Sequence, residues 1–213
     1  MSQSELLNKV SAYYSDKIRT HGPTPKGADW RDEHSQHLRF ARLLDVVNPE
    51  DRTGTISELG CGYGALATYL RNTDRQNTYI GSDISADMIE AARRLHHDTP
   101  NTQFELGNEP HASDYVIASG IFNVRFDIPD QEWQAYIDRT IDGMVVKARR
   151  GVAFNCLTAY SDRDRMDPRL FYASPGQMLT WCIERYGRHV ALRHDYGLYE
   201  YTMIIRMVPE DRA

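Results

Sequence analysis

The stretch TISELGCGYGALATYL, Thr55–Leu70, places three glycines at every second position between an apolar run and an amphipathic one. The apolar run Thr55–Leu59 predicts a buried strand, and the amphipathic run predicts a helix. A loop with Gly60, Gly62 and Gly64 lets the backbone pass close to a ligand and offers N–H groups at the start of the helix. The stretch therefore predicts a strand, loop and helix unit that binds a nucleotide-containing cofactor.

The chain from Thr53 onward alternates short apolar runs with helical patterns, which is typical of a parallel sheet covered on both faces. The predicted strands are Thr55–Leu59, Thr78–Gly81, Gln103–Leu106, Tyr115–Ala118, Val152–Asn155, His189–His194 and Tyr201–Val208. The last two are joined by the short link DYGLYE, which leaves no room for a crossover helix and requires an antiparallel pair. We therefore predict an α/β fold with a doubly wound, seven-stranded sheet and an antiparallel last strand.

Capping residues predict helix boundaries within this pattern. Ser85 is a preferred N-cap after the second strand, and Ser174 followed by Pro175 predicts another helix start. Gly187 predicts the end of that later helix, and a further helix is expected to stop before Gly151.

The first 48 residues are polar-rich and predict two helices, separated by the segment RTHGPTPKGADW, Arg19–Trp30. Two prolines and two glycines cannot continue a helix, so this segment is expected to be an ordered loop or a lid. We predict a helical N-terminal cap over residues 1–48 and a cofactor-binding domain over residues 49–213. Lys26 and Trp30 would suit a cover over the cofactor and an anionic acceptor, and both are predicted to bind substrate.

The composition limits the possible partners and compartments. A net charge of −5 argues against a large nucleic-acid footprint. Cys61, Cys156 and Cys182 are widely separated, which predicts neither a zinc pattern nor a disulfide framework and favours a reducing compartment. The start MSQSELLNKV lacks signal-peptide features, and no apolar run is long enough to cross a bilayer. We therefore expect a cytoplasmic protein with no membrane or metal partner; the sequence leaves its oligomeric state open.

The glycine loop by itself fits two kinds of cofactor. With Ala65 in the last position it satisfies the dinucleotide pattern G-x-G-x-x-A, and Asp83 lies about 20 residues further on, where a ribose-binding acid is expected. However, Glu58 precedes Gly60 by two residues, where a carboxylate repels a pyrophosphate and attracts a sulfonium or an ammonium. The antiparallel end of the sheet also differs from the usual dinucleotide domain. Both features favour S-adenosylmethionine over NAD.

On these residues the chain resembles the class I S-adenosylmethionine-dependent methyltransferases. ELGCGYG fits their first motif, an acid followed by glycine at every second position, and YIGSDIS supplies the acid after the second strand. The stretches YYSDK, HGPTPKGADW, ASGIFN, FNCLT and HDYGLYE look like a bacterial branch of the family that acts on small molecules. The resemblance implies a Rossmann-like sheet and S-adenosylmethionine as the cofactor.

The resemblance also implies which residues bind the cofactor. The glycine loop would pass beneath its amino-acid part, an acid would bind the ribose hydroxyls, an apolar side chain would pack on the adenine, and an amide would meet the adenine amino group. The end of the fourth strand would face the methyl group, and an arginine would meet the carboxylate. The loop residues are Glu58, Gly60, Cys61, Gly62 and Gly64. The acid is Asp83, the apolar side chain is Ile84 and the amide is Asn108. The end of the fourth strand carries Ser119 and Gly120, and the arginine is Arg39.

Methyl transfer from a sulfonium needs no obligatory nucleophile, because most of the acceleration can come from positioning and desolvation. Asn123 and Asn155 follow the fourth and fifth strands, at the edge where ligands bind in open α/β sheets. We predict both as substrate-binding and catalytic residues, with Tyr14 as a third catalytic candidate.

The predicted function is therefore S-adenosylmethionine-dependent methyl transfer to a small-molecule acceptor. Two alternatives stay open at this point, a nicotinamide-dependent oxidoreductase and a non-catalytic module that binds S-adenosylmethionine. The acceptor, and the atom that is methylated, are not predicted by the sequence.

Overall fold

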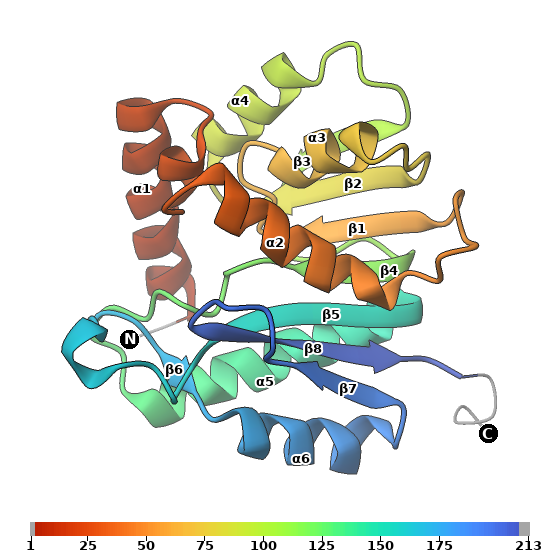
Figure 1. The fold of residues 1–213 in the computed structure, drawn as a ribbon. Coiled ribbons are helices and arrows are strands. Elements are labelled where there is room, and N and C mark those ends of the chain that lie inside the picture. The colour runs from red at the N-terminus through yellow and green to blue at the C-terminus, as the bar shows by residue number, and fades with distance from the viewer. Residues whose placement is uncertain (1–2, 209–213) are drawn as a thin grey trace.

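The computed structural model describes residues 3–208 and contains a central sheet in the order β3-β2-β1-β4-β5-β8-β7 (Figure 1). β1 to β5 run parallel, and β8 is antiparallel to both β5 and β7. The strands are β1 Thr55–Leu59, β2 Thr78–Asp83, β3 Thr102–Leu106, β4 Ser113–Ala118, β5 Ala148–Thr158, β7 Val190–Arg193 and β8 Glu200–Arg206. The predicted doubly wound sheet with an antiparallel end is confirmed.

Most strands differ from their predicted bounds by one or two residues at an end, and two differences are larger. β5 is longer than Val152–Asn155 at both ends, and a two-residue strand, β6 (Tyr172–Ala173), adds to its far end. The extension carries Arg149 and Arg150, whose polarity hides it from an apolar pattern. β6 is too short to show any periodicity.

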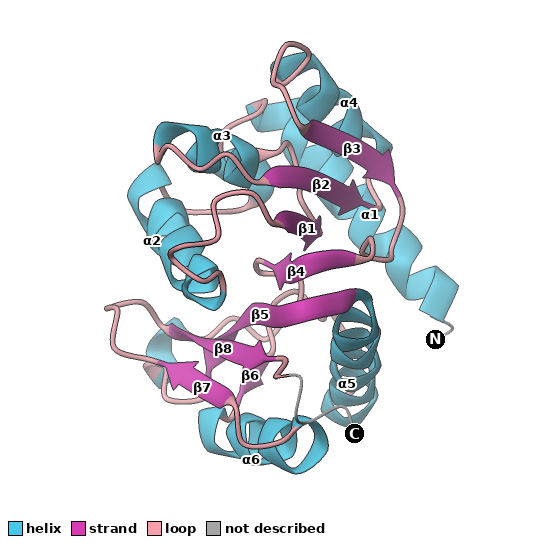
Figure 2. Ribbon diagram, turned by 90° about the vertical axis from the view of Figure 1, so that its right-hand side faces the viewer, coloured by secondary structure: helices cyan, strands magenta, loops and turns pink. Residues whose placement is uncertain are grey.

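The helices cover both faces of the sheet; Figure 2 shows α2 and α3 on one side and α5 on the other. They are α1 Gln3–His21, α2 Glu33–Leu43, α3 Ala65–Asn72, α4 Ala86–Leu95, α5 Asp130–Lys147 and α6 Pro175–Tyr186, with short 3₁₀ turns at Pro25–Ala28, Leu44–Val46 and Arg163–Arg165. Ser85 and Ser174 accept hydrogen bonds from Met88 N and Gln177 N, so both predicted N-caps are confirmed.

The core forms on both faces because side chains alternate along each strand. On β4, Tyr115 and Ile117 pack in the cluster that α2, α3 and α4 cover, whereas Val116 and Ala118 pack in the cluster under α5 and α6. The central strands are therefore buried on both sides, which is why their sequences are continuous apolar runs.

Helix α1 lies across the edge of the sheet toward which β1 and β2 point (Figure 1). Ser11 Oγ donates to the carbonyl of Ile84, and Ser15 Oγ lies 2.8 Å from Ser85 Oγ. These bonds join α1 to the segment between β2 and α4, so α1 covers the carboxyl ends of the strands. Helix α2 instead shares the core with β1, because Phe40 packs in the same cluster as Ile56.

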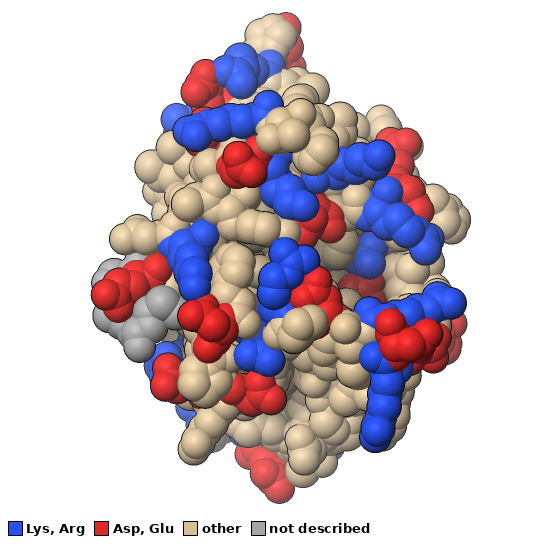
Figure 3. Space-filling view, turned by 90° about the vertical axis from the view of Figure 1, so that its left-hand side faces the viewer, with Lys and Arg blue, Asp and Glu red and all other residues tan. Residues whose placement is uncertain are grey.

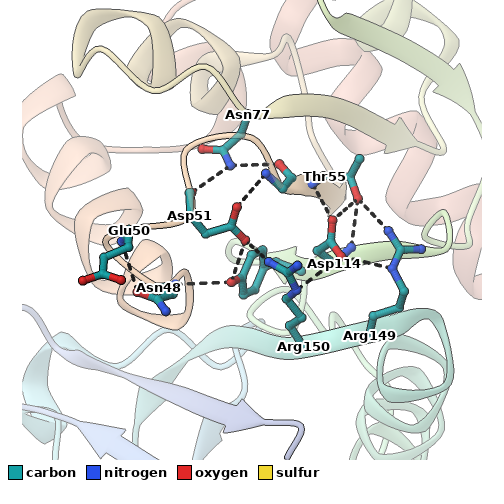
Figure 4. Close-up of polar contacts among 10 residues, drawn as sticks. Asn48, Glu50, Asp51, Thr55, Asn77, Asp114, Arg149 and Arg150 are labelled. Atoms are coloured by element: carbon teal, nitrogen blue, oxygen red, sulfur yellow. Dashed lines mark hydrogen bonds and ion pairs between the residues drawn. The ribbon is translucent and has the colours of Figure 1, made fainter.

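The opposite edge of the sheet is held by a polar network around two carboxylates (Figure 4). Asp114 accepts from Thr55 N at 2.8 Å and from Arg149 Nε at 3.0 Å, and Asp51 pairs with Arg150. Burial opposes ionisation of Asp114, but the bonds from Arg149 and Thr55 lower its pKa to about 2. The network ties the starts of β1, β4 and β5 together, away from the ligand edge.

Candidate active site

A cavity of about 970 Å³, counting its open mouth, lies at the carboxyl edge of the sheet. On the side of the sheet, the cavity is lined by the ends of β1 and β2 and by the loops that follow β3 and β4. Helix α1, the segment after it and helix α2 form the cover, and α5 contributes one side. Open α/β sheets bind ligands at this edge, so the fold itself marks the cavity as the candidate site.

The glycine loop forms the wall of this cavity after β1. Gly60, Gly62 and Gly64 all have positive φ, at 75°, 54° and 83°. A Cβ on Gly60 would collide with Ile121, and one on Gly64 would lie 2.7 Å from the ring of Phe104. The first two glycines line the cavity, whereas Gly64 begins α3 and is required by packing behind the loop.

Asp83, at the end of β2, is tied to the glycine loop by its carboxylate. One oxygen accepts from Gly62 N at 2.8 Å, and the other accepts from Ser85 N at 2.8 Å. Burial raises the pKa of Asp83, and the hydrogen bonds from Ser85 and Gly62 oppose that rise. Each oxygen keeps a further lone pair, so this cavity-lining carboxylate can accept hydrogen bonds from a ligand.

Glu58, the acid before the glycines, is a second buried carboxyl in the cavity wall. It is 2% exposed, and the hydroxyl of Tyr79 donates to its Oε2. Burial raises the pKa of Glu58 to about 8, against the hydrogen bond from Tyr79, which lowers it. The carboxyl therefore holds a proton at neutral pH, and a cation placed beside it would favour its ionisation.

The charge of the cavity lining is one-sided. Among the described residues, Glu58 and Asp83 are the only carboxyl side chains that line it, and no Lys, Arg or His side chain does. Burial also raises the pKa of Cys61 well above its usual value, which removes it as a thiolate nucleophile. Such a lining suits a cationic ligand and offers nothing to neutralise an anion.

The structure brings most of the predicted cofactor residues to this one cavity. Ser119 Oγ is buried there without a hydrogen-bond partner. Glu58, Gly60, Cys61, Gly62, Asp83, Ile84, Asn108, Ser119 and Gly120 line the cavity, whereas Gly64 and Arg39 do not.

Arg39 has other partners in the structure. Its Nε pairs with Glu200 Oε1, and its guanidinium lies 4.1 Å from the centre of the Trp30 ring. The structure therefore places Arg39 behind the cavity wall rather than in the cavity.

The predicted substrate and catalytic residues separate into two groups. Trp30 and Tyr14 line the cavity, whereas Lys26 is exposed and lies outside it. Asn155 is fully buried, with Gly120 N donating to its Oδ1 at 2.8 Å, and Asn123 is 7% exposed. Neither asparagine lines the cavity.

Several cavity residues were not predicted as site residues. Gln36 and Tyr63 are a hydrogen-bonded pair in the wall, with Tyr63 Oη donating to Gln36 Oε1 at 3.2 Å. Leu6 and Val10 of α1 also line the cavity, and the sequence predicted this helix but not its position over the site. Trp133 of α5 is a cavity residue for which the sequence carries no functional signal.

Three features of the described residues lie outside the cavity. Basic and acidic side chains are interspersed on the face in Figure 3, so neither sign forms a broad patch there. No helix within residues 3–208 is long and apolar enough to cross a membrane. The same part of the chain holds no cluster of His, Cys, Asp and Glu that could bind a metal ion.

Comparison with known proteins gives the family. A family model described as a methyltransferase domain matches residues 57–141. The protein named "Putative methyltransferase Rv1506c" from Mycobacterium tuberculosis is 44% identical over 164 residues, covering 76% of this chain and 98% of that protein. A fatty-acid O-methyltransferase from Mycolicibacterium smegmatis is 45% identical over 42 residues, covering 20% of this chain and 15% of that protein.

Solved structures share the fold at low sequence identity. Magnesium protoporphyrin IX methyltransferase from Synechocystis PCC 6803, crystallised with S-adenosylmethionine, has a TM-score of 0.64 at 16% identity, with 94% of this chain and 96% of that chain covered. The DhpI-SAM-HEP complex has a TM-score of 0.65 at 16% identity, with 97% of this chain and all of that chain covered.

The chain therefore belongs to the class I S-adenosylmethionine-dependent methyltransferases. The predicted family, enzyme class and cofactor are confirmed, and the nicotinamide alternative has no support.

Proposed function

We propose that this methyltransferase acts on a small-molecule acceptor. The observation that carries the proposal is the cover of the cavity. Helix α1 and the loop that bears Trp30 cover the carboxyl edge of the sheet, and helix α2 adds Gln36 and Phe40 to the cavity wall. A large acceptor could reach the cavity only after this cover moved, whereas a small molecule can enter through the mouth.

The charge of the cavity fits the cofactor. S-adenosylmethionine supplies a methyl group on a sulfonium, which is an already activated leaving group. Glu58 and Asp83 provide two carboxyls without a neighbouring cation in the lining, as a sulfonium and an ammonium require. Ser119 Oγ, buried without a partner, is available to a bound ligand.

Three positions are assigned roles in holding the cofactor. We assign the ribose hydroxyls to Asp83, whose oxygens already fix the glycine loop, and the ammonium side to Glu58. Asn108, in the link after β3, lines the cavity where an adenine amino group could be met by its side-chain oxygen.

Gln36 takes the place that the sequence gave to Arg39. Because Tyr63 Oη donates to the oxygen of the Gln36 side chain, the amide nitrogen remains as a donor for a carboxylate. Gln36 lines the cavity, and Arg39, three residues later, does not. We therefore assign the cofactor carboxylate to Gln36.

The residues of the cavity act on the reaction mainly by position and by excluding water. The ring of Trp30 and the apolar face of α1 keep solvent from the site, which favours an in-line displacement. Burial raises the pKa of Tyr14 far above its usual value, so its hydroxyl can donate a hydrogen bond but not serve as a base near pH 7. We therefore expect an acceptor atom that is nucleophilic without help from a cavity base.

We also propose the predicted division into a cap over residues 1–48 and a domain over residues 49–213. The position of α1 over the strand ends supports it, although α2 shares the main core with β1. A cytoplasmic location is also proposed, on the observation that Cys61, Cys156 and Cys182 are all free thiols.

The test has a binding step and a transfer step. Calorimetry should show that S-adenosylhomocysteine binds the wild type and that Asp83→Asn weakens it at least about tenfold, because an amide cannot accept both backbone N–H bonds. Asp98→Asn, an exposed carboxylate on the surface, is the matched control and should bind as the wild type does.

For transfer, the enzyme is incubated with S-adenosylmethionine labelled in its methyl group and a bacterial extract. Label is expected in the small-molecule filtrate and not in protein, RNA or DNA. Label confined to a macromolecular fraction would contradict the proposed acceptor class, and binding of NAD(H) without S-adenosylhomocysteine would contradict the cofactor.

A further inference from the structure

A buried ion pair joins α2 to β8 behind the cavity. Arg39 Nε faces Glu200 Oε1, with side chains that are 11% and 0% exposed. Burial lowers the pKa of Arg39 and raises that of Glu200, while their mutual attraction opposes both shifts. Burying two charges removes their hydration, and apolar replacements are often equally stable. Stability is therefore a weak reason for a pair at this place.

The carboxylate of this pair reaches the cavity through Asn155. Glu200 Oε2 accepts from Asn155 Nδ2 at 2.7 Å, and Asn155 Oδ1 accepts from Gly120 N at 2.8 Å. Gly120 follows β4 and lines the cavity. Both ends of the buried amide are therefore used to connect Glu200 to the backbone of the cavity wall.

The Arg39 guanidinium is linked to the same glycine indirectly, through the Trp30 ring. Its stacking under the Trp30 ring, at 4.1 Å, supports the indole from behind. A Cβ on Gly120 would lie too close to the edge of that indole, and Gly120 has a φ of 75°. The contacts close a ring, the Gly120 circuit, which runs through Trp30, Arg39, Glu200, Asn155 and back to Gly120.

We propose that Arg39, Glu200 and Asn155 are positioning residues of the methyltransferase site. Through the contacts of the circuit they hold the indole of Trp30 in place against Gly120 and fix the orientation of the Gly120 peptide. Two cavity walls that are far apart in the chain, one with Trp30 and one with Gly120, thereby keep one geometry. This inference rests on the proposed function, because it assumes that these walls enclose the cofactor and its acceptor.

The circuit makes each of its members dependent on the others. Without the Glu200 carboxylate, the Arg39 guanidinium loses the ion pair that holds it against the Trp30 ring, and its stacking position is no longer fixed. Without Asn155, Gly120 N loses its acceptor in a buried place, where an unpaired donor is costly. Substitution of Glu200 in β8 or of Asn155 in β5 is therefore expected to move the indole of Trp30.

The test uses the full chain labelled with 5-fluorotryptophan. The three tryptophans give three ¹⁹F resonances, and Trp30→Phe assigns one of them. Glu200→Gln, which keeps the shape of the side chain, is expected to shift and broaden the Trp30 resonance and to leave those of Trp133 and Trp181 unchanged.

The chain offers a matched control for this variant. The Arg185 guanidinium lies 5.7 Å from the Trp181 ring and pairs with Asp142 at 2.5 Å, on the surface and away from the cavity. Asp142→Asn is expected to affect only the Trp181 resonance and to leave the affinity for S-adenosylhomocysteine unchanged.

The second readout is cofactor affinity. Glu200→Gln and Asn155→Ala are each expected to weaken S-adenosylhomocysteine binding about tenfold, the effect of losing one buried hydrogen bond to a charged or backbone group. If either single variant fails to fold, Arg39→Met combined with Glu200→Met keeps the space filled without charge and is expected to release Trp30 in the same way.

A wild-type Trp30 resonance together with wild-type affinity in these variants would overturn the inference, even if the melting temperature fell. The proposed function fails separately, if the wild type binds no S-adenosylhomocysteine. In that case the ¹⁹F comparison in the free protein still decides whether the circuit holds Trp30.

Discussion

Cofactor binding at neutral pH is expected to release a proton from Glu58. With a pKa of about 8 in the free protein, about 0.9 of the Glu58 carboxyls hold a proton at pH 7. On the proposed placement, the cofactor brings an ammonium, and in S-adenosylmethionine also a sulfonium, into a cavity that carboxyl side chains line and no described Lys, Arg or His side chain does. A cation there lowers the pKa of Glu58, so the proton leaves as the cofactor enters.

The pH dependence follows from the same linkage. On the role proposed for Glu58, its ionised form binds the cation, and the population of that form grows as pH rises toward 8. The apparent affinity should therefore increase with pH by up to about tenfold per unit below pH 8 and become constant above it.

Calorimetry in two buffers of different ionisation enthalpy, such as phosphate and Tris, measures the number of protons released. We expect about 0.9 per bound S-adenosylhomocysteine at pH 7. Glu58→Gln should reduce this number to near zero, whereas Glu50→Gln, at an exposed position, should leave it unchanged. A wild-type value near zero, or an undiminished value in Glu58→Gln, would refute the reasoning.

Two further predictions concern stability. Gly64→Ala should lower the free energy of unfolding by about 2–4 kcal/mol, because a positive φ and contact with Phe104 both oppose a Cβ. Gly143 lies in open space on α5, so Gly143→Ala should raise the free energy of unfolding by about 0.5–1 kcal/mol. Urea denaturation checks both, and the same sign for the two variants would contradict the argument. Because the pKa of Asp114 is lowered to about 2, its stabilisation is present above its usual pKa of 3.8 and is lost as pH falls from about 4 toward 2. Asp114→Asn should cost about 1–2 kcal/mol at pH 7, after allowance for its partial contact with solvent, and should flatten the acid part of the stability curve; an acid midpoint unchanged from the wild type would be the opposing result.

The fold was largely predictable because its elements repeat local patterns. β1 coincides with the predicted strand Thr55–Leu59, and the N-caps Ser85 and Ser174 accept the expected hydrogen bonds. The extension of β5 through Arg149 and Arg150 was hidden because those residues satisfy a network at the strand start rather than the core (Figure 4).

The candidate site was predictable where its residues follow strand ends in a fixed order. The glycine loop after β1 and Asp83 after β2 lie at one edge of a parallel sheet, so their proximity follows from the order of the elements. Asn155 also follows this rule in sequence, yet its side chain turns to Glu200 and the Gly120 peptide instead of lining the cavity. The strand-end rule gives the edge but not the direction of a side chain.

The sequence by itself favoured S-adenosylmethionine as the cofactor, because a carboxyl, three glycines and a second acid are set at short spacings by local chain geometry. Only the tertiary structure decided which polar side chains face the cavity. Arg39 and Glu200 are far apart in the chain, and their pairing depends on α2 packing beside β8. Since a buried charge requires a partner, that packing keeps Arg39 out of the cavity and leaves Gln36 in its wall.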